Sequence, residues 1–213
     1  MLSPPRLQPL LSRSAIPLWL KIVYTVWLAV WVAVYWQSYG PQNFLWMCDL
    51  ANLIVGVAIW IESPLLFSSQ AVAVLIIQAL WIVDVCGRLL LGLHVIGGTE
   101  YMFDPERSIG LRALSLFHVF VPILVLWAIR RLGYDPRGWK LQTLIVWLLL
   151  PLTYLVTDPE RNINWLWKPF GLAQTVLPEL GYLALAMLAV PLVLYLPTHA
   201  VLARWTRNRP APR

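Results

Sequence analysis

The chain has 213 residues, of which 60% are hydrophobic and only 12% are charged, and its mean hydropathy is +0.69. This composition excludes a soluble globular domain and indicates a polytopic membrane protein. The net charge of +6 does not indicate binding to nucleic acid, because the basic residues flank the apolar segments. Basic residues in this position set the orientation of membrane proteins.

The sequence contains six segments that are apolar and long enough to cross a membrane, since a transmembrane helix needs about 20 such residues. We expect helices over residues 17–36, 44–61, 65–86, 111–129, 141–157 and 182–203. These segments take up most of the chain, so residues 1–213 are predicted to form one all-α domain, a six-helix transmembrane bundle. Prolines inside the later spans are expected to bend them: Pro122, Pro151 and Pro191.

The first segment follows Arg6 and Arg13, as the apolar region of a secretory signal would. Its apolar stretch runs from Pro17 to Trp36, which is longer than the roughly 7 to 15 residues of a signal's apolar region. We therefore expect it to remain attached as a transmembrane helix.

The basic residues are distributed unequally between the two sides of a six-span topology. One side has eleven of the sixteen, namely Arg6, Arg13, Lys21, Arg130, Arg131, Arg137, Lys140, Arg204, Arg207, Arg209 and Arg213. The other side has five, namely Arg88, Arg107, Arg112, Arg161 and Lys168. Because Lys and Arg accumulate on the cytoplasmic side, we expect both termini in the cytoplasm and the protein in the inner (plasma) membrane of a bacterium.

Polar residues inside the predicted spans share the outer side of the membrane. They are Cys48, Asp49 and Asn52 in the second span, Asp84 in the third, and Arg112, Ser115 and His118 in the fourth. The two longest loops, 87–110 and 158–181, lie on the same side. Because polar groups within a membrane are costly unless they are paired or used, this pattern predicts an extracytoplasmic functional site.

Two of these residues, Cys48 and His118, are predicted to lie at similar depths. With a helical rise of about 1.5 Å per residue, Cys48 lies roughly 6 Å and His118 roughly 10 Å inside the membrane. Cys48 and Asn52 share one face of the second span with Gly56, whose lack of a side chain permits close helix approach. Asp49 lies about 100° away from that face.

The order of several short motifs over residues 43–199 resembles the YwaF-like six-span bacterial membrane proteins. These motifs are the "CD" pair of the second span, the His within "LSLFHVFVPILVLW", and the "NINW" loop before the last span. The family is distantly akin to eukaryotic phospholipid acyltransferases and to lipid hydrolases of the androgen-induced-gene type. The resemblance implies a nucleophile at Cys48 and a catalytic His118. The chain departs from the family in reading "NFLWMC" where "LPLHLC" is common, and in having a single His in the fourth span.

A Cys and a His at this depth are suited to acyl transfer or hydrolysis of membrane lipids. The His takes the thiol proton, the thiolate forms an acyl-thioester, and Asn52 or backbone amides hydrogen-bond the oxyanion. The remaining polar residues are predicted to bind substrate: Asp49, Asn52, Asp84, Arg112, Ser115, Asn162 and Asn164.

Each of these residues also has a structural interpretation. Cys48 is also consistent with a packing residue or with a disulfide to Cys86. Asp84 and Arg88 have the spacing of an ion pair on one helical face. Asn162 and Asn164 can bind a lipid headgroup or cap a turn. Gln70 and Gln78, eight residues apart on one face, are expected to hydrogen-bond between helices.

No soluble-type cofactor motif or metal-ligand pattern occurs in the sequence, and we expect neither a cofactor nor a metal. Two other function classes stay open besides a lipid enzyme. A small transporter is disfavoured because the last two spans have almost no polar residues at mid-depth. A non-catalytic scaffold or subunit is the remaining alternative. The sequence does not indicate an oligomeric state.

Overall fold

The computed structural model describes residues 14–207. These residues form α-helices, short helical turns and loops, with no β-strand in this range, which confirms the predicted all-α class. The α-helices are α1 (Leu18–Tyr39), α2 (Met47–Ile61), α3 (Pro64–Leu91), α4 (Ile109–Leu114), α5 (Phe117–Leu132), α6 (Gly138–Val156), α7 (Glu179–Ala189) and α8 (Leu196–Arg207).

Five helical segments among the described residues are long and apolar enough to cross a membrane. They are Leu18–Tyr39, Pro64–Leu91, Ile109–Leu132, Gly138–Val156 and Glu179–Arg207. The predicted span 44–61 differs, because its first residues form the short turn η1 (Pro41–Leu45) and only α2, with 15 residues, remains helical. At about 1.5 Å per residue, α2 is roughly 22 Å long.

Two of the long segments are interrupted. The fourth predicted span breaks at Ser115, between α4 and α5, while α5 and α6 continue as α-helices through Pro122 and Pro151. The last span changes to a π-helical turn, Val190–Tyr195, between α7 and α8. Pro191 lies in that turn, and a proline cannot donate the usual intrahelical hydrogen bond.

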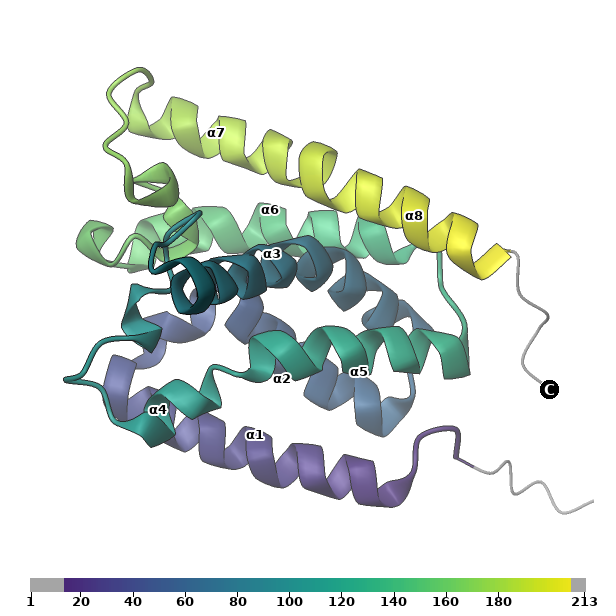
Figure 1. Ribbon diagram of the computed structural model, residues 1–213. Coiled ribbons are helices and arrows are strands. Elements are labelled where there is room, and N and C mark those ends of the chain that lie inside the picture. Colours follow the sequence, from purple (N-terminus) through teal and green to yellow (C-terminus); the bar gives the residue numbers. More distant parts are fainter. Residues whose placement is uncertain (1–13, 208–213) are drawn as a thin grey trace, which may run out of the picture.

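α3 lies at the centre of the bundle and packs against α2, α5 and α6 (Figure 1). At the crossing with α6, a Cβ on Gly138 would lie 2.6 Å from the Cβ of Ser68 and 2.8 Å from the nitrogen of Ser69. The absence of a side chain at Gly138 therefore permits this close contact. One turn further, Gln70 donates a 3.1 Å hydrogen bond to Gln142, which confirms the interhelical bonding predicted for Gln70. Gln78 is buried and has no such partner.

Glu62, directly after α2, binds the beginning of α1. Its carboxylate accepts a 2.7 Å hydrogen bond from Lys21, a 2.9 Å hydrogen bond from the backbone of Ala15, and further bonds from the backbone of Ile16 and the hydroxyl of Ser14. Burial alone would raise the pKa of Glu62, but these donors outweigh it and lower the pKa from 4.5 to about 2. The interaction fixes α2 antiparallel to α1.

We predict that acid removes the stability contributed by the Glu62 carboxylate. Because the pKa of Glu62 is lower in the folded state, its stabilising effect is complete above pH 4.5 and is lost as the pH falls toward 2. Thermal melting of the purified protein in detergent should show a fall in Tm over this window that is smaller in the Glu62→Gln variant. Glu106→Gln, in an exposed loop, is the control. Identical pH dependence of wild type and Glu62→Gln would contradict the assignment.

Candidate functional site

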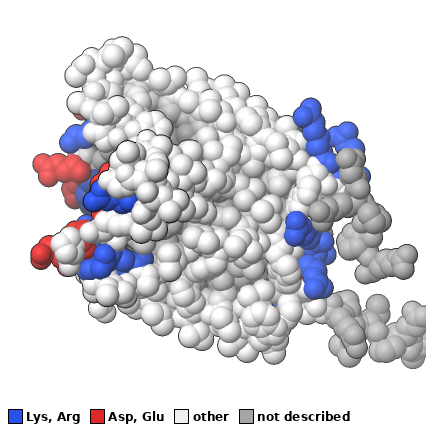
Figure 2. Space-filling view, in the orientation of Figure 1, with Lys and Arg blue, Asp and Glu red and all other residues white. Residues whose placement is uncertain are grey.

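The bundle has two chemically different ends. The connections 92–108 and 157–178 form one end, which we call the loop end, and the chain ends of the described range meet at the other, the terminal end (Figure 1). The surface shows acidic and basic side chains together at the loop end but Lys and Arg at the terminal end (Figure 2). The predicted site residues belong to the helix ends and connections of the loop end.

Asp49 is a buried carboxylate in the first turn of α2. Gly40, with φ of 73°, ends α1 and starts η1, so that Asn43 comes to lie over the beginning of α2. Asn43 donates a 2.6 Å hydrogen bond to Asp49 Oδ2. The thiol of Cys48 lies 3.8 Å from Asp49 Oδ1 and donates to it. A carboxylate is also favoured near a helix N-terminus. Asp49 therefore has hydrogen-bond partners, Asn43 and Cys48, from neighbouring parts of the chain.

Three hydroxyl groups from separate segments belong to the same end of the bundle as this pair. Tyr35 of α1 and Ser115 share a buried hydrogen bond of 2.7 Å. Tyr101, in the short turn η2 (Glu100–Met102), accepts a 3.1 Å hydrogen bond from the indole of Trp81. Burial raises the pKa of Tyr101, contacts with Ser115 and Trp81 oppose this, and the nearby Asp49 carboxylate raises it further. Tyr101 therefore keeps its proton at neutral pH.

His118 lies in the first turn of α5, with its ring between two aromatic side chains. The ring centroid is 4.6 Å from that of Trp81 and 4.0 Å from that of Phe117, both in stacked geometry. Its Nδ1 lies 2.8 Å from the carbonyl of Ser115, and since a carbonyl only accepts, Nδ1 donates. Nε2 therefore has the free lone pair.

The structure gives Cys48 and His118 different hydrogen-bond partners, and their predicted pairing stays a prediction. No hydrogen bond between these two side chains occurs among the described residues, and the partner of the thiol is Asp49. The alternative disulfide is not formed, since Cys48 and Cys86 are both free. Trp81 connects the two halves, because its ring stacks on His118 and its N–H binds Tyr101.

Asp84 is buried near the end of α3 and holds the loop that follows. It accepts hydrogen bonds from the backbone of Ile96 at 2.6 Å and of Gly97 at 2.9 Å, and from the hydroxyl of Thr99. His94 Nδ1 lies 3.0 Å away. The pairing of Asp84 with Arg88 was a wrong prediction, since Arg88 donates to the carbonyl of Gly92 instead. Asp84 therefore holds residues 96–99 of the loop against the end of α3.

The two asparagines of "NINW" hold backbone segments. Asn164, with φ of 55°, accepts from the amide of Met47 at 2.9 Å and donates to the carbonyl of Leu45 at 2.8 Å, which caps the start of α2. Asn162 accepts from the amides of Trp167 and Lys168 within its own loop. Of the two interpretations that the sequence left open, the contacts agree with turn capping.

Two further predicted residues have unpaired atoms. Arg112 in α4 donates to the carbonyl of Met102 at 3.1 Å, but its Nε is buried and has no partner. The amide of Asn52 is fully buried and also has no partner, while the backbone carbonyl of Asn52 accepts from Tyr24. Neither side chain contacts the Cys48 thiol by a hydrogen bond.

The sequence did not single out four residues that complete this cluster: Tyr35, Asn43, Trp81 and Tyr101. A signal existed for Trp81, which precedes Asp84 by three residues and therefore shares a helical face with it. No local pattern marks Tyr101, because its position depends on the fold of the loop held by Asp84.

Comparison with known protein families, characterised proteins and solved structures finds no match.

Proposed function

We propose that this chain is a six-span protein of the bacterial inner membrane with both termini in the cytoplasm. The five long apolar helices support insertion into a membrane. α2 supports a sixth crossing, since it connects the loop end of α1 to the terminal end of α3 (Figure 1). Because η1 and loop 157–178 cover its first residues, α2 needs fewer residues than a helix that meets lipid along its whole length.

Reporter fusions test this orientation. A fluorescent protein fused after Arg213 should be active in the cytoplasm, and alkaline phosphatase inserted at Glu106 should be active outside it, because the excess of Lys and Arg lies at the terminal end. Reversed activities, or activity of both reporters in one compartment, would contradict the topology.

For the polar cluster of Cys48, Asp49, Tyr101, Ser115 and His118, we propose lipid-directed acyl transfer or hydrolysis in the outer leaflet. The observation that supports it is the Cys48 thiol directed at the buried Asp49, at the same end of the bundle as the Tyr101 hydroxyl. A nucleophile beside a proton acceptor and a hydrogen-bond donor is the arrangement used in covalent acyl transfer. The resemblance to the YwaF-like proteins leads to the same reaction class.

The chemistry assigns a role to each group. Cys48 Sγ attacks the ester carbonyl of a membrane lipid while its proton passes to Asp49, and Tyr101 donates to the oxyanion. The ester C–O bond breaks, the departing alkoxide takes the proton from Asp49, and an acyl-thioester remains on Cys48. Water or the hydroxyl of a lyso-lipid then attacks the thioester and gives its proton to Asp49. The C–S bond breaks, and the sulfur takes that proton from Asp49, which regenerates the thiol. His118 acts as a positioning residue through Trp81, which holds Tyr101.

A non-catalytic scaffold is the second candidate, and a specific observation favours it. Asp84, Asn162 and Asn164 use their side chains to hold loop segments. In a scaffold, the same polar groups stabilise the loop end and Cys48 only packs.

Thiol labelling separates these two candidates. Purified protein is treated with N-hexadecyl iodoacetamide, and the labelling of each cysteine is followed by mass spectrometry. We predict that Asp49→Asn slows the labelling of Cys48 by about tenfold or more, because the proton acceptor is lost. His118→Ala should slow it less, since it acts through Trp81 and Tyr101.

Cys86 is the internal control, because it is exposed and lies outside the cluster. Its labelling rate should stay the same in both variants. If Cys48 labels at the same rate with and without the Asp49 carboxylate, or if both cysteines slow equally, Cys48 is a packing residue and the scaffold assignment holds.

A further inference from the structure

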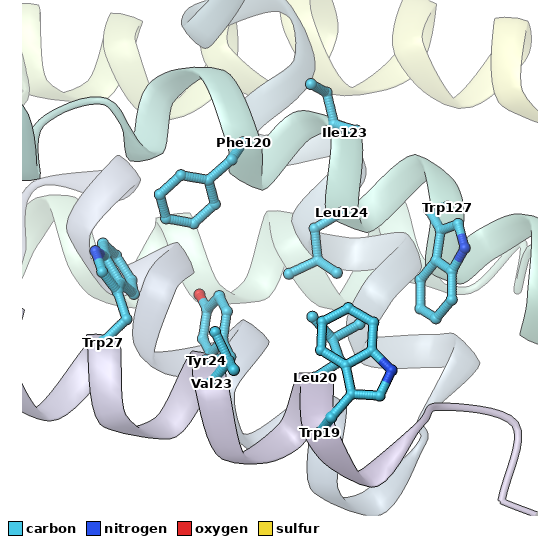
Figure 3. A pocket seen from close by; sticks show the side chains of 9 residues that line it. All are labelled: Trp19, Leu20, Val23, Tyr24, Trp27, Phe120, Ile123, Leu124 and Trp127. Carbon is cyan, nitrogen blue, oxygen red and sulfur yellow. The ribbon is translucent and has the colours of Figure 1, made fainter.

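An apolar groove opens between α1 and α5, and its lining contains no residue of the polar cluster (Figure 3). Its volume is about 510 Å³. Leu124 of α5 points toward α1, and Trp19 of α1 faces Trp127 of α5 across the groove (Figure 3). The complete lining is Trp19, Leu20, Val23, Tyr24, Trp27, Phe120, Ile123, Leu124 and Trp127.

The lining suits a flexible apolar chain better than a helix. Helices associate in membranes through Gly, Ala, Ser and Thr, which let two backbones approach closely, and none of the nine lining residues is of these types. The hydroxyl of Tyr24 is already used, since it donates to the carbonyl of Asn52. The walls therefore present hydrocarbon and aromatic rings over the length of about eight residues of α1, or roughly 12 Å.

Hydrogen-bond donors that have no acceptor within residues 14–207 lie at the terminal end of this groove. The indole nitrogens of Trp19 and Trp127 both lie on the side of the view from which α1 begins (Figure 3). The guanidinium of the exposed Arg131 lies over the Trp127 ring, 5.5 Å from its centroid. No acidic residue forms an ion pair with Arg131 among the described residues. This end is therefore suited to an anionic group with several acceptor oxygens.

We propose that the groove binds one phospholipid with an anionic headgroup, from the leaflet at the terminal end. An acyl chain lies between α1 and α5, the phosphate is bound by Arg131, and the two indoles lie at the level of the ester groups. Tryptophan prefers this interfacial depth, and clustered basic side chains at a membrane surface select anionic lipids. This site lies at the opposite end of the bundle from Cys48 and is independent of the acyl-transfer proposal.

The site can be tested with the full chain in nanodiscs of mixed phosphatidylglycerol and phosphatidylcholine. Lipids retained after release are identified by native mass spectrometry. Arg131→Gln should lower the retained ratio of phosphatidylglycerol to phosphatidylcholine by about fivefold, the effect of one basic side chain at an anionic surface. Arg130→Gln is the matched control, because Arg130 lies over Trp205 of α8, 5.0 Å from the ring centroid, and should leave the ratio unchanged.

A second pair of variants tests the groove itself. Leu124→Trp should fill it and abolish retention of the bound lipid, whereas Leu155→Trp, at an exposed position of α6, should not. If Leu124→Trp fails to fold, the arginine pair still decides. Equal lipid ratios in the two arginine variants, or no enrichment of phosphatidylglycerol in the wild type, would overturn the proposal. A dimer that Leu124→Trp dissociates would assign the groove to a second copy of the chain instead.

Discussion

The architecture of the loop end depends on the carboxylate of Asp84. This side chain is buried near the end of α3 and accepts hydrogen bonds from the backbone of residues 96 and 97 and from Thr99. A buried carboxylate is costly unless several donors satisfy it, so the loop has to close over Asp84. Tyr101 follows Thr99 by two residues and is brought against Trp81 by the same closure. One charged side chain therefore determines where the loop supplies its donor.

The same requirement explains how polar residues are distributed through the bundle. In an apolar environment each polar group needs a partner within the protein. At the crossing of α3 and α6 the partners are Gln70 and Gln142, and at the terminal end they are Lys21 and Glu62. Around Cys48, the hydroxyls of Tyr35 and Ser115 bond each other, and the Asp49 carboxylate accepts from Asn43 and Cys48. The amide of Asn52 has no partner among the described residues. Gln78 of α3 is likewise buried without a partner within residues 14–207, so the bundle does not satisfy all of its polar groups.

Hydrophobicity predicted most of the fold, because the length and position of apolar segments determine helical spans independently of tertiary contacts. Five spans correspond to long helices, whereas α2 is shorter than predicted because Gly40 and the turn η1 use the first residues of its apolar segment. The break at Ser115 had no sequence signal. Depth along the spans predicted that Cys48 and His118 share one end of the bundle. Their separate partners are Asp49 for Cys48 and Trp81 for His118, and these depend on how each helix is rotated about its axis. The pattern of apolar residues does not determine this rotation in helices that are apolar on all sides.

The role of Asp84 is the most direct test of this account, and hydrogen–deuterium exchange of the loop measures it. In the Asp84→Asn variant, exchange of a peptide covering residues 94–103 should become about tenfold faster or more, because the amides of Ile96 and Gly97 lose a charged acceptor. The same peptide in Glu106→Gln, a substitution in the exposed part of the loop, should exchange as in the wild type. Unchanged protection of residues 94–103 in Asp84→Asn would contradict the account, because the loop would then be held in place without this carboxylate.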